Sequence, residues 1–175
     1  MQNRKETYVE KTPNDIYRDV GNETDLTTDE VASIGGVESQ HGKYNSPMAG
    51  GSARGLFQFQ PKTAEALSPG SSESLEDLNT QSKLMKLYLQ KNEAESAEDA
   101  FIKHNLGNRG GNRFLEATDD ALISTVVPAR VIRANPGIYQ VKTVGEARQK
   151  IKEKLKKGSD SSKVIPNFED LFKGE

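Results

Sequence analysis

The chain lacks cysteine, and this excludes disulfide bridges and thiolate metal sites. Histidine is scarce as well: His41 and His104 lie far apart and lack the spacing of metal ligands. A zinc enzyme is therefore not expected, and we expect no metal and no cofactor. Long apolar runs are also missing, because no segment approaches the roughly 20 apolar residues that a membrane span needs.

Neither sign of charge dominates, since 24 lysines and arginines stand against 26 aspartates and glutamates, for a net charge of −2. General nucleic-acid binders are usually clearly basic, so no nucleic-acid partner is expected. A length of 175 residues favours one domain with a real core. Hydrophobic residues make up 33% and charged residues 29%, so the core accounts for part of the chain and polar tails are expected.

Apolar residues recur mainly at helical spacing, and alternating strand patterns are scarce, so the sequence predicts a mostly α fold. Thr27 with Glu30 has the pattern of a capping box before the first clear helix, and Thr143 with Glu146 repeats it before the last. The spacing predicts helices over residues 28–41, 62–67, 78–91, 97–106, 118–127 and 144–155.

Composition divides the chain into three parts. Residues 1–26 are polar and are predicted to form an extended arm or a few short turns. Residues 27–156 are predicted to form the folded domain. Residues 157–175 are predicted to be a linker and a C-terminal docking tail, whose apolar residues at helical spacing are Phe168, Leu171 and Phe172.

Glu38 stands out on the first predicted helix. At 100° per residue it shares one stripe with Val31, Ile34 and Gly35, so it extends the apolar face. It also lies in the last turn, where the helix dipole is negative. Burial and that potential both disfavour a carboxylate and should raise the pKa of Glu38, as a general acid requires. From the helix wheel alone, the alternative is an ordinary glutamate at the rim of the core.

The neighbouring residues form a pattern of three parts. The pair Glu38-Ser39 ends the helix. A loop then leads to residues 55–58 (Gly-Leu-Phe-Gln), which are followed by residues 61–64 (Pro-Lys-Thr-Ala) at the start of the next helix. Residues 105–107 (Asn-Leu-Gly) form the third part, at the end of a later helix.

Together these parts resemble the soluble lytic transglycosylase and goose-type lysozyme family over roughly residues 28–140. The departures are Phe57, where the family usually has methionine, and His104, where it has tyrosine. The resemblance implies a lysozyme-like fold. It also implies cleavage of the β-1,4 bond between N-acetylmuramic acid and N-acetylglucosamine. It does not extend to residues 1–26 or to the C-terminal tail.

Glycosidases that use two carboxylates need a partner for Glu38. Neither Glu65 nor Asp99 has a spacing that argues for this role, and the resemblance implies that none is needed. By the family mechanism, Glu38 first protonates the glycosidic oxygen while the substrate's acetamido group assists departure. The resulting carboxylate then takes the proton from the sugar's 6-hydroxyl, which closes a 1,6-anhydro ring. If water reacts instead, the enzyme is a hydrolase of the goose-lysozyme type.

The resemblance places five further residues in substrate binding. Ser39 bonds to the sugar or orients the acid, unless it is merely a polar residue at a helix end. Gln58 binds an acetamido or hydroxyl group, unless its amide braces the backbone, and Gly55 lets the chain pass close to the sugar. Asn105 is expected to face the cleft from the opposite side. Tyr139 is the candidate for a late tyrosine that approaches the acid in the family.

Two more side chains have open interpretations. Tyr44 lies in the loop on the cleft side, where it can stack on a sugar or be an ordinary surface residue. His104 shares a helical face with Ala97, Ala100 and Phe101, which favours a histidine packed against the core.

The first residues lack the apolar stretch of a secretory signal, and no wall-binding module is recognisable. We therefore expect a bacteriophage virion protein that degrades the host cell wall locally, in the periplasm, during genome entry. Its partners are then peptidoglycan glycan strands and other virion proteins, in the tail or the particle interior, contacted through the terminal arms. The alternatives are an endolysin that acts at host lysis and an inactive lysozyme-like structural tail protein. Retention of Glu38, Gln58 and Asn105 argues against the latter.

Overall fold

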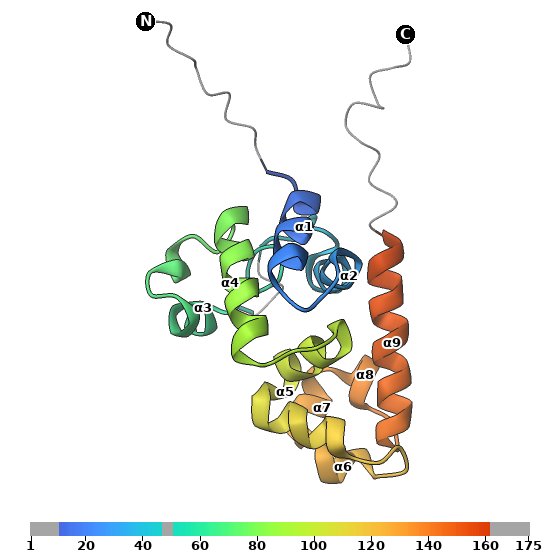
Figure 1. The fold of residues 1–175 in the computed structure, drawn as a ribbon. Helices are drawn as coiled ribbons and strands as arrows, with labels where there is room; N and C mark the ends of the chain where they lie inside the picture. Colours follow the sequence, from blue (N-terminus) through green and yellow to red (C-terminus); the bar gives the residue numbers. More distant parts are fainter. Residues whose placement is uncertain (1–10, 47–50, 162–175) are drawn as a thin grey trace, which may run out of the picture.

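The computed structural model describes residues 11–46 and 51–161, and this part of the chain is mostly helical (Figure 1). Its elements are α1 (Pro13–Glu23), α2 (Thr28–Ser39), α3 (Pro61–Leu67), the 3-10 turn η1 (Ser71–Glu73), α4 (Leu78–Lys91), α5 (Ala97–Glu116), α6 (Ile123–Val126), α7 (Ala129–Ala134), α8 (Pro136–Tyr139) and α9 (Val144–Ser161). Within the described ranges, strand-like pairing is limited to two isolated bridges, Arg54 with Phe59 and Leu122 with Thr143. The prediction of a mostly α fold is confirmed.

Helix α1 replaces the predicted polar arm over residues 13–23, so that prediction is wrong there. Thr12 and Asp15 form a capping box, in which each side chain bonds to the backbone of the other, and Pro13 occupies the first turn. Burial of one apolar face stabilises the helix. The buried residues on this face are Ile16, Tyr17 and Val20. The segment 13–23 therefore belongs to the core.

Helix α2 begins as predicted. The hydroxyl of Thr27 accepts from the amide of Glu30, and the Glu30 carboxylate accepts from the amide of Thr27 at 2.9 Å. The helix ends at Ser39, two residues before the predicted end, because Gln40 and His41 take left-handed φ values of 50° and 57°. Such values are uncommon for residues other than glycine, and tertiary contacts of His41 hold this turn.

His41 is buried and joins three parts of the fold. Its Nε2 lies 2.9 Å from the carbonyl oxygen of Gly158 in α9, and its Nδ1 lies 2.9 Å from the hydroxyl of Tyr17 in α1. Because a carbonyl oxygen can only accept, Nε2 carries the proton and Nδ1 accepts from Tyr17. Burial lowers the pKa of His41, against the opposing hydrogen bond to Gly158, so the ring is neutral near pH 7.

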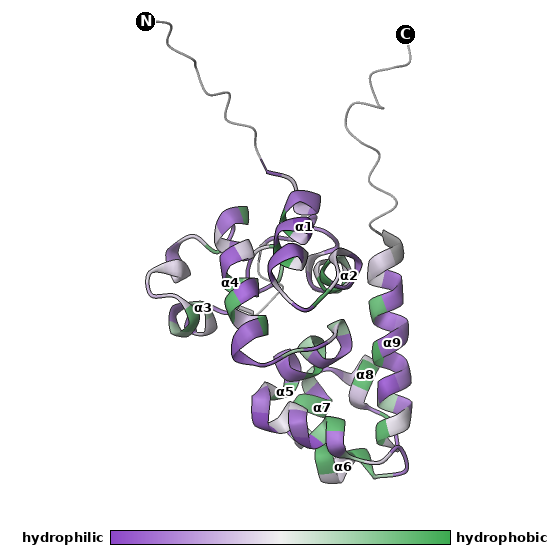
Figure 2. Cartoon of the chain, viewed as in Figure 1, coloured by the Kyte–Doolittle hydropathy of each residue, from purple (hydrophilic) through white to green (hydrophobic). Residues whose placement is uncertain are grey.

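Helix α9 runs along one side of the molecule, from α2 at one end to α6 and α8 at the other (Figure 1). Most of it is hydrophilic in Figure 2, and the buried positions recur at helical spacing: Val144, Ala147, Ile151 and Leu155. The helix continues to Ser161, so the prediction of a linker from residue 157 is wrong as far as the structure describes the chain. Phe168, Leu171 and Phe172 lie outside the described residues.

Gly158 lies where α9 packs against the backbone of α2. A Cβ at Gly158 would lie 2.4 Å from the carbonyl oxygen of Ser33, and a Cβ at Gly36 would lie 2.4 Å from the carbonyl oxygen of Gly158. Contacts this short exclude any side chain at either position. Gly158, which lies in the segment predicted as a linker, is therefore the residue that lets α9 approach the backbone of α2.

Arg148 fastens α9 to the end of α5. Its Nη2 donates to the carbonyl oxygens of Phe114, Leu115 and Ala117 at 2.8–3.0 Å, and its Nη1 pairs with Asp119. Carbonyls at a helix C-terminus lack partners within the helix. That of Phe114 also accepts from the amide of Ala117, and the guanidinium supplies a donor to all three.

Candidate active site

Glu38 lies in the last turn of α2 and lines a narrow pocket with a cavity volume of about 10 Å³. The wall comes from α2, the turn before α3, α4 and α5, and consists of Ile34, Glu38, Phe57, Phe59, Met85, Tyr88, Ala100, Phe101 and His104. Ile34 is on the same face of α2, as the helix wheel predicts. Among these lining residues Glu38 is the only carboxylate.

The surroundings of Glu38 disfavour its charged form. The side chain is half-buried, and no hydrogen bond among the described residues involves its carboxylate. Burial raises the pKa of Glu38, while the positive charges of His104 and, to a smaller extent, Lys154 act in the opposite direction. The predicted direction of this pKa shift is thus also the one that the structure gives.

Gly55 is required by the protein's own packing. It has a φ of +80°, and a Cβ there would lie 2.1 Å from the carbonyl oxygen of Leu75 and 2.3 Å from Nε2 of Gln81. Gln81 is fully buried, accepts from the amide of Phe57 at 2.8 Å and donates to Leu75 at 2.6 Å. Gly55 therefore permits a close approach to α4 and to the loop before it. The buried Gln81 fixes the turn, and sequence reasoning did not select this residue.

Ser39 also acts inside the protein. Its side chain is buried, its hydroxyl donates to the carbonyl oxygen of Leu56 at 2.7 Å, and it accepts from the amide of Gly42 at 2.8 Å. The hydroxyl thereby ties the end of α2 to the turn that carries Phe57. Of the predicted roles, orientation of the helix end that bears Glu38 agrees with these contacts.

Gln58 braces two loops through its amide. Its Nε2 donates to the carbonyl oxygens of Tyr44 and Gly55 at 3.0 and 2.9 Å, and the side chain is buried. The alternative of a backbone-bracing amide therefore describes its nitrogen. The ring of Tyr44 is 47% exposed, with Nζ of Lys43 5.3 Å from its centroid.

Asn105 and Tyr139 are not among the residues that line the Glu38 pocket. The amide nitrogen of Asn105 donates to the carbonyl oxygen of Phe101, one turn earlier in α5. Tyr139 is fully buried, its ring lies against Phe114, and its hydroxyl has no partner among the described residues. A ring without exposed surface cannot contact a sugar in this arrangement.

Two aromatic residues complete the pocket, and neither was selected as a site residue from the sequence. Tyr88 and His104 have ring centroids 5.8 Å apart, and Phe59 lies 5.9 and 6.3 Å from them, all edge to face. His104 is exposed, and its ring lies against the buried rings of Phe59 and Tyr88, so it packs against the core, as predicted, without being buried in it. His104 lies three residues before Gly107, where a φ of 71° interrupts α5. A histidine close to a glycine that ends a helical turn is the sequence feature that could have drawn attention to this position.

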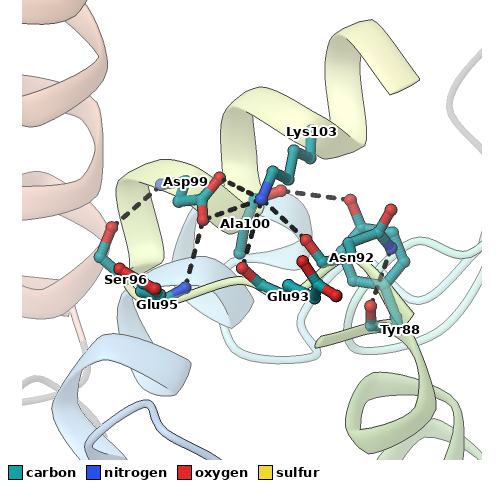
Figure 3. Close-up of polar contacts among 8 residues, drawn as sticks. All are labelled: Tyr88, Asn92, Glu93, Glu95, Ser96, Asp99, Ala100 and Lys103. Atoms are coloured by element: carbon teal, nitrogen blue, oxygen red, sulfur yellow. Dashed lines mark hydrogen bonds and ion pairs between the residues drawn. The ribbon is translucent and has the colours of Figure 1, made fainter. Parts of the chain in front are cut away.

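A buried ion pair between Lys103 and Asp99 lies where α5 meets the end of α4, the helix that carries Tyr88 (Figure 3). Lys103 donates to the Asp99 carboxylate at 3.0 Å and to the carbonyl oxygens of Asn92 and Glu93 at 2.7 and 3.3 Å, so α5 holds the end of α4. The hydroxyl of Tyr88 donates to the carbonyl oxygen of Ala100 in α5 at 3.3 Å. Burial raises the pKa of Tyr88, with smaller contributions from the charges of Asp99 and Glu38, so the phenol stays protonated.

Comparisons with known proteins do not identify the chain: no protein-family model matches it, and a search of curated proteins gave no match. Among the described helices, none has the length and apolar character to cross a membrane. The described residues also contain no group of three or more histidine, aspartate or glutamate side chains arranged to hold a metal ion.

Proposed function

We propose that this chain is a peptidoglycan lytic transglycosylase with a lysozyme-like fold, and that Glu38 is its catalytic acid. The observation that carries the proposal is the environment of Glu38. It is the one carboxylate in a pocket whose other described lining residues are apolar or aromatic, and burial raises its pKa. A carboxylic acid that keeps its proton near neutral pH can protonate a leaving oxygen.

The absence of a second carboxylate among the lining residues favours a mechanism with one acid. Glu38 donates its proton to the glycosidic oxygen as the bond from that oxygen to C1 of the muramyl sugar breaks. The acetamido oxygen of the same sugar forms a bond to C1. The 6-hydroxyl oxygen then displaces it and loses its proton to the Glu38 carboxylate. The products are a 1,6-anhydro end and a free 4-hydroxyl, and Glu38 regains its starting form.

Two cations favour the carboxylate that exists between these steps. His104 and Lys154 both lower the pKa of Glu38, against the stronger effect of burial. Opposing contributions of this kind bring the pKa of a general acid close to the operating pH. The group can then both donate and accept a proton at that pH. Loss of either side chain should therefore raise the pKa of Glu38, which weakens the acid as a proton donor and strengthens its carboxylate as the base that removes the 6-hydroxyl proton.

The products of digestion test the proposal. Purified peptidoglycan is incubated with the protein, and the released muropeptides are analysed by mass. Anhydro ends are expected, whereas reducing ends would point to a hydrolase and no cleavage would refute the proposed activity. Glu38→Gln should be inactive, and the exposed Glu116→Gln variant is the matched control that should retain activity.

Carriage in a phage particle, with local degradation of the host wall, stays a separate prediction. Mass spectrometry of purified particles tests it directly. Presence of the chain in intact particles is the expected result, and detection only in the lysate would favour the endolysin.

A further inference from the structure

A second cavity lies between α9 and the segment that joins α7 to α8. It has a cavity volume of about 440 Å³, larger than the pocket of Glu38. Its lining residues are Ala134, Asn135, Pro136, Gly137, Ile138, Lys150, Glu153, Lys154 and Lys157. We refer to these residues as the basic groove. A Cβ at Gly137 would meet nothing within 4 Å, so the groove is open on the side of α8.

The basic groove concentrates positive charge on a chain whose net charge is −2. Lys150, Lys154 and Lys157 follow one another at i, i+4 and i+7, so they lie on one face of α9. No ion pair between described residues uses Lys150 or Lys154. The one carboxylate of the groove, Glu153, accepts from Gln149 at 3.1 Å. The groove therefore favours an anionic ligand.

Lys154 places the basic groove beside the candidate active site. Its Nζ lies 5.6 Å from the ring centroid of Phe101, and Phe101 lines the pocket of Glu38. The charge of Lys154 also acts on Glu38. A ligand whose sugar lies at Glu38 can thus place a substituent in the groove without leaving the protein surface.

We propose that the basic groove binds the carboxylates of the peptide stem that the muramyl sugar carries. This proposal rests on the proposed function, because the stem is attached to the sugar whose bond is cleaved. The stem is a flexible anionic peptide, and its carboxylates match the lysine ammonium groups of α9 in charge. Specificity for stem-bearing glycan then comes from Lys150 and Lys154, apart from the acid that breaks the bond.

Calorimetric titration of the inactive Glu38→Gln protein tests the proposal without turnover. The probe is a tetrasaccharide of peptidoglycan with free stem carboxylates, compared with the same compound after amidation of those carboxylates. The free form should bind about five- to tenfold more tightly, as two exposed charge contacts permit. The added pair Lys150→Gln and Lys154→Gln should abolish this preference. The pair Lys152→Gln and Lys156→Gln removes equal charge from exposed positions outside the groove and should retain it.

The outcomes separate the two proposals. Equal affinity for both probes, or a preference that survives Lys150→Gln and Lys154→Gln, refutes the proposal that the basic groove binds stem carboxylates. If the wild type still cleaves peptidoglycan, the proposed enzymatic function is unaffected by that result. If the Glu38→Gln protein binds neither probe and the wild type cleaves no peptidoglycan, the proposed function fails and the stem site fails with it. Thermal unfolding of each variant checks that these exposed substitutions leave the fold intact.

Discussion

Replacing Glu38 by glutamine should strengthen the fold at neutral pH while it removes the proposed activity. The reason is that a charged Glu38 is stabilised less by its half-buried site than by water, whereas glutamine resembles the protonated acid. Burial is the largest influence on the pKa of Glu38 and raises it above the ordinary value of 4.5. The folded state therefore holds the proton more tightly than the unfolded state does.

The pH dependence follows from this difference in proton binding. Below about pH 4.5 both states are protonated, and Glu38 costs the fold nothing relative to glutamine. As the pH rises through the raised pKa, the unfolded state releases the proton first and the folded state loses stability until both are ionised. Each tenfold difference in proton affinity is worth about 1.4 kcal/mol, and about 1 kcal/mol moves the melting temperature by roughly 2–4 °C in a chain of this size.

Urea unfolding of the wild type and Glu38→Gln, followed at pH 4 and pH 7.5, measures the effect. The two curves should nearly coincide at pH 4, and the variant should be the more stable at pH 7.5. Glu30→Gln on the same helix is the matched control with the opposite sign. Burial acts to raise the pKa of Glu30, but hydrogen bonds from Thr27 outweigh it and hold that pKa low, so this variant should lose stability at pH 7.5. A Glu38→Gln protein that is less stable than the wild type at pH 7.5, or equally shifted at both pH values, refutes the reasoning.

Three further predictions concern packing, the buried ion pair and the imidazole that lines the pocket of Glu38. Gly158→Ala should destabilise the fold by about 1–3 kcal/mol, because the added Cβ would lie 2.4 Å from a backbone oxygen of α2. Gly137→Ala has open space around it and should not destabilise the fold. Chemical denaturation compares the two variants. Lys103→Met should cost about 3–5 kcal/mol, because it leaves a buried carboxylate without its cation, and neutralising that carboxylate as well should recover part of the loss in a double-mutant cycle. His104→Phe should raise the pKa of Glu38, so the fall of kcat at high pH should move to higher pH, which a pH–rate profile measures.

Each of these has a result that contradicts it. Equal stability of the two glycine variants would mean that α9 does not approach α2 as closely as described. An additive double-mutant cycle at the ion pair would mean that the two charges do not stabilise each other. An unchanged pH–rate profile in His104→Phe would mean that the imidazole of His104 does not influence the pKa of Glu38.

Local signals in the sequence were sufficient for the parts of the fold that depend on neighbouring residues. The capping box of Thr27 and Glu30 and the apolar stripe that includes Glu38 are both present in the structure. The same chemistry was available at Thr12 and Asp15, where the short, largely polar α1 was mistaken for an arm. Gly158 was ambiguous for a different reason, since only the approach of a distant helix distinguishes a linker glycine from a packing glycine.

The candidate site was predictable only in part, because its walls come from segments that meet through long-range contacts. Lys103 ties the residues after α4, the helix that carries Tyr88, to α5, and an isolated lysine in a charged sequence gives no sign of that role. Ser39 and Gln58 are predicted substrate-binding residues, but the hydrogen bonds of Ser39 to Leu56 and of Gln58 to Tyr44 are internal to the protein. Sequence pattern indicates which residues gather around a turn, whereas the direction of each polar group depends on packing.

The hydrogen bond between His41 and Gly158 joins residues 117 positions apart. Contacts of such long range form late, because a large loop must close before they stabilise anything. The turn that follows Glu38 therefore takes its final shape only after residue 158 has been synthesised and α9 has settled against α2. A chain still emerging from the ribosome carries Glu38 without the complete set of contacts around it, so the order of folding would delay the proposed activity.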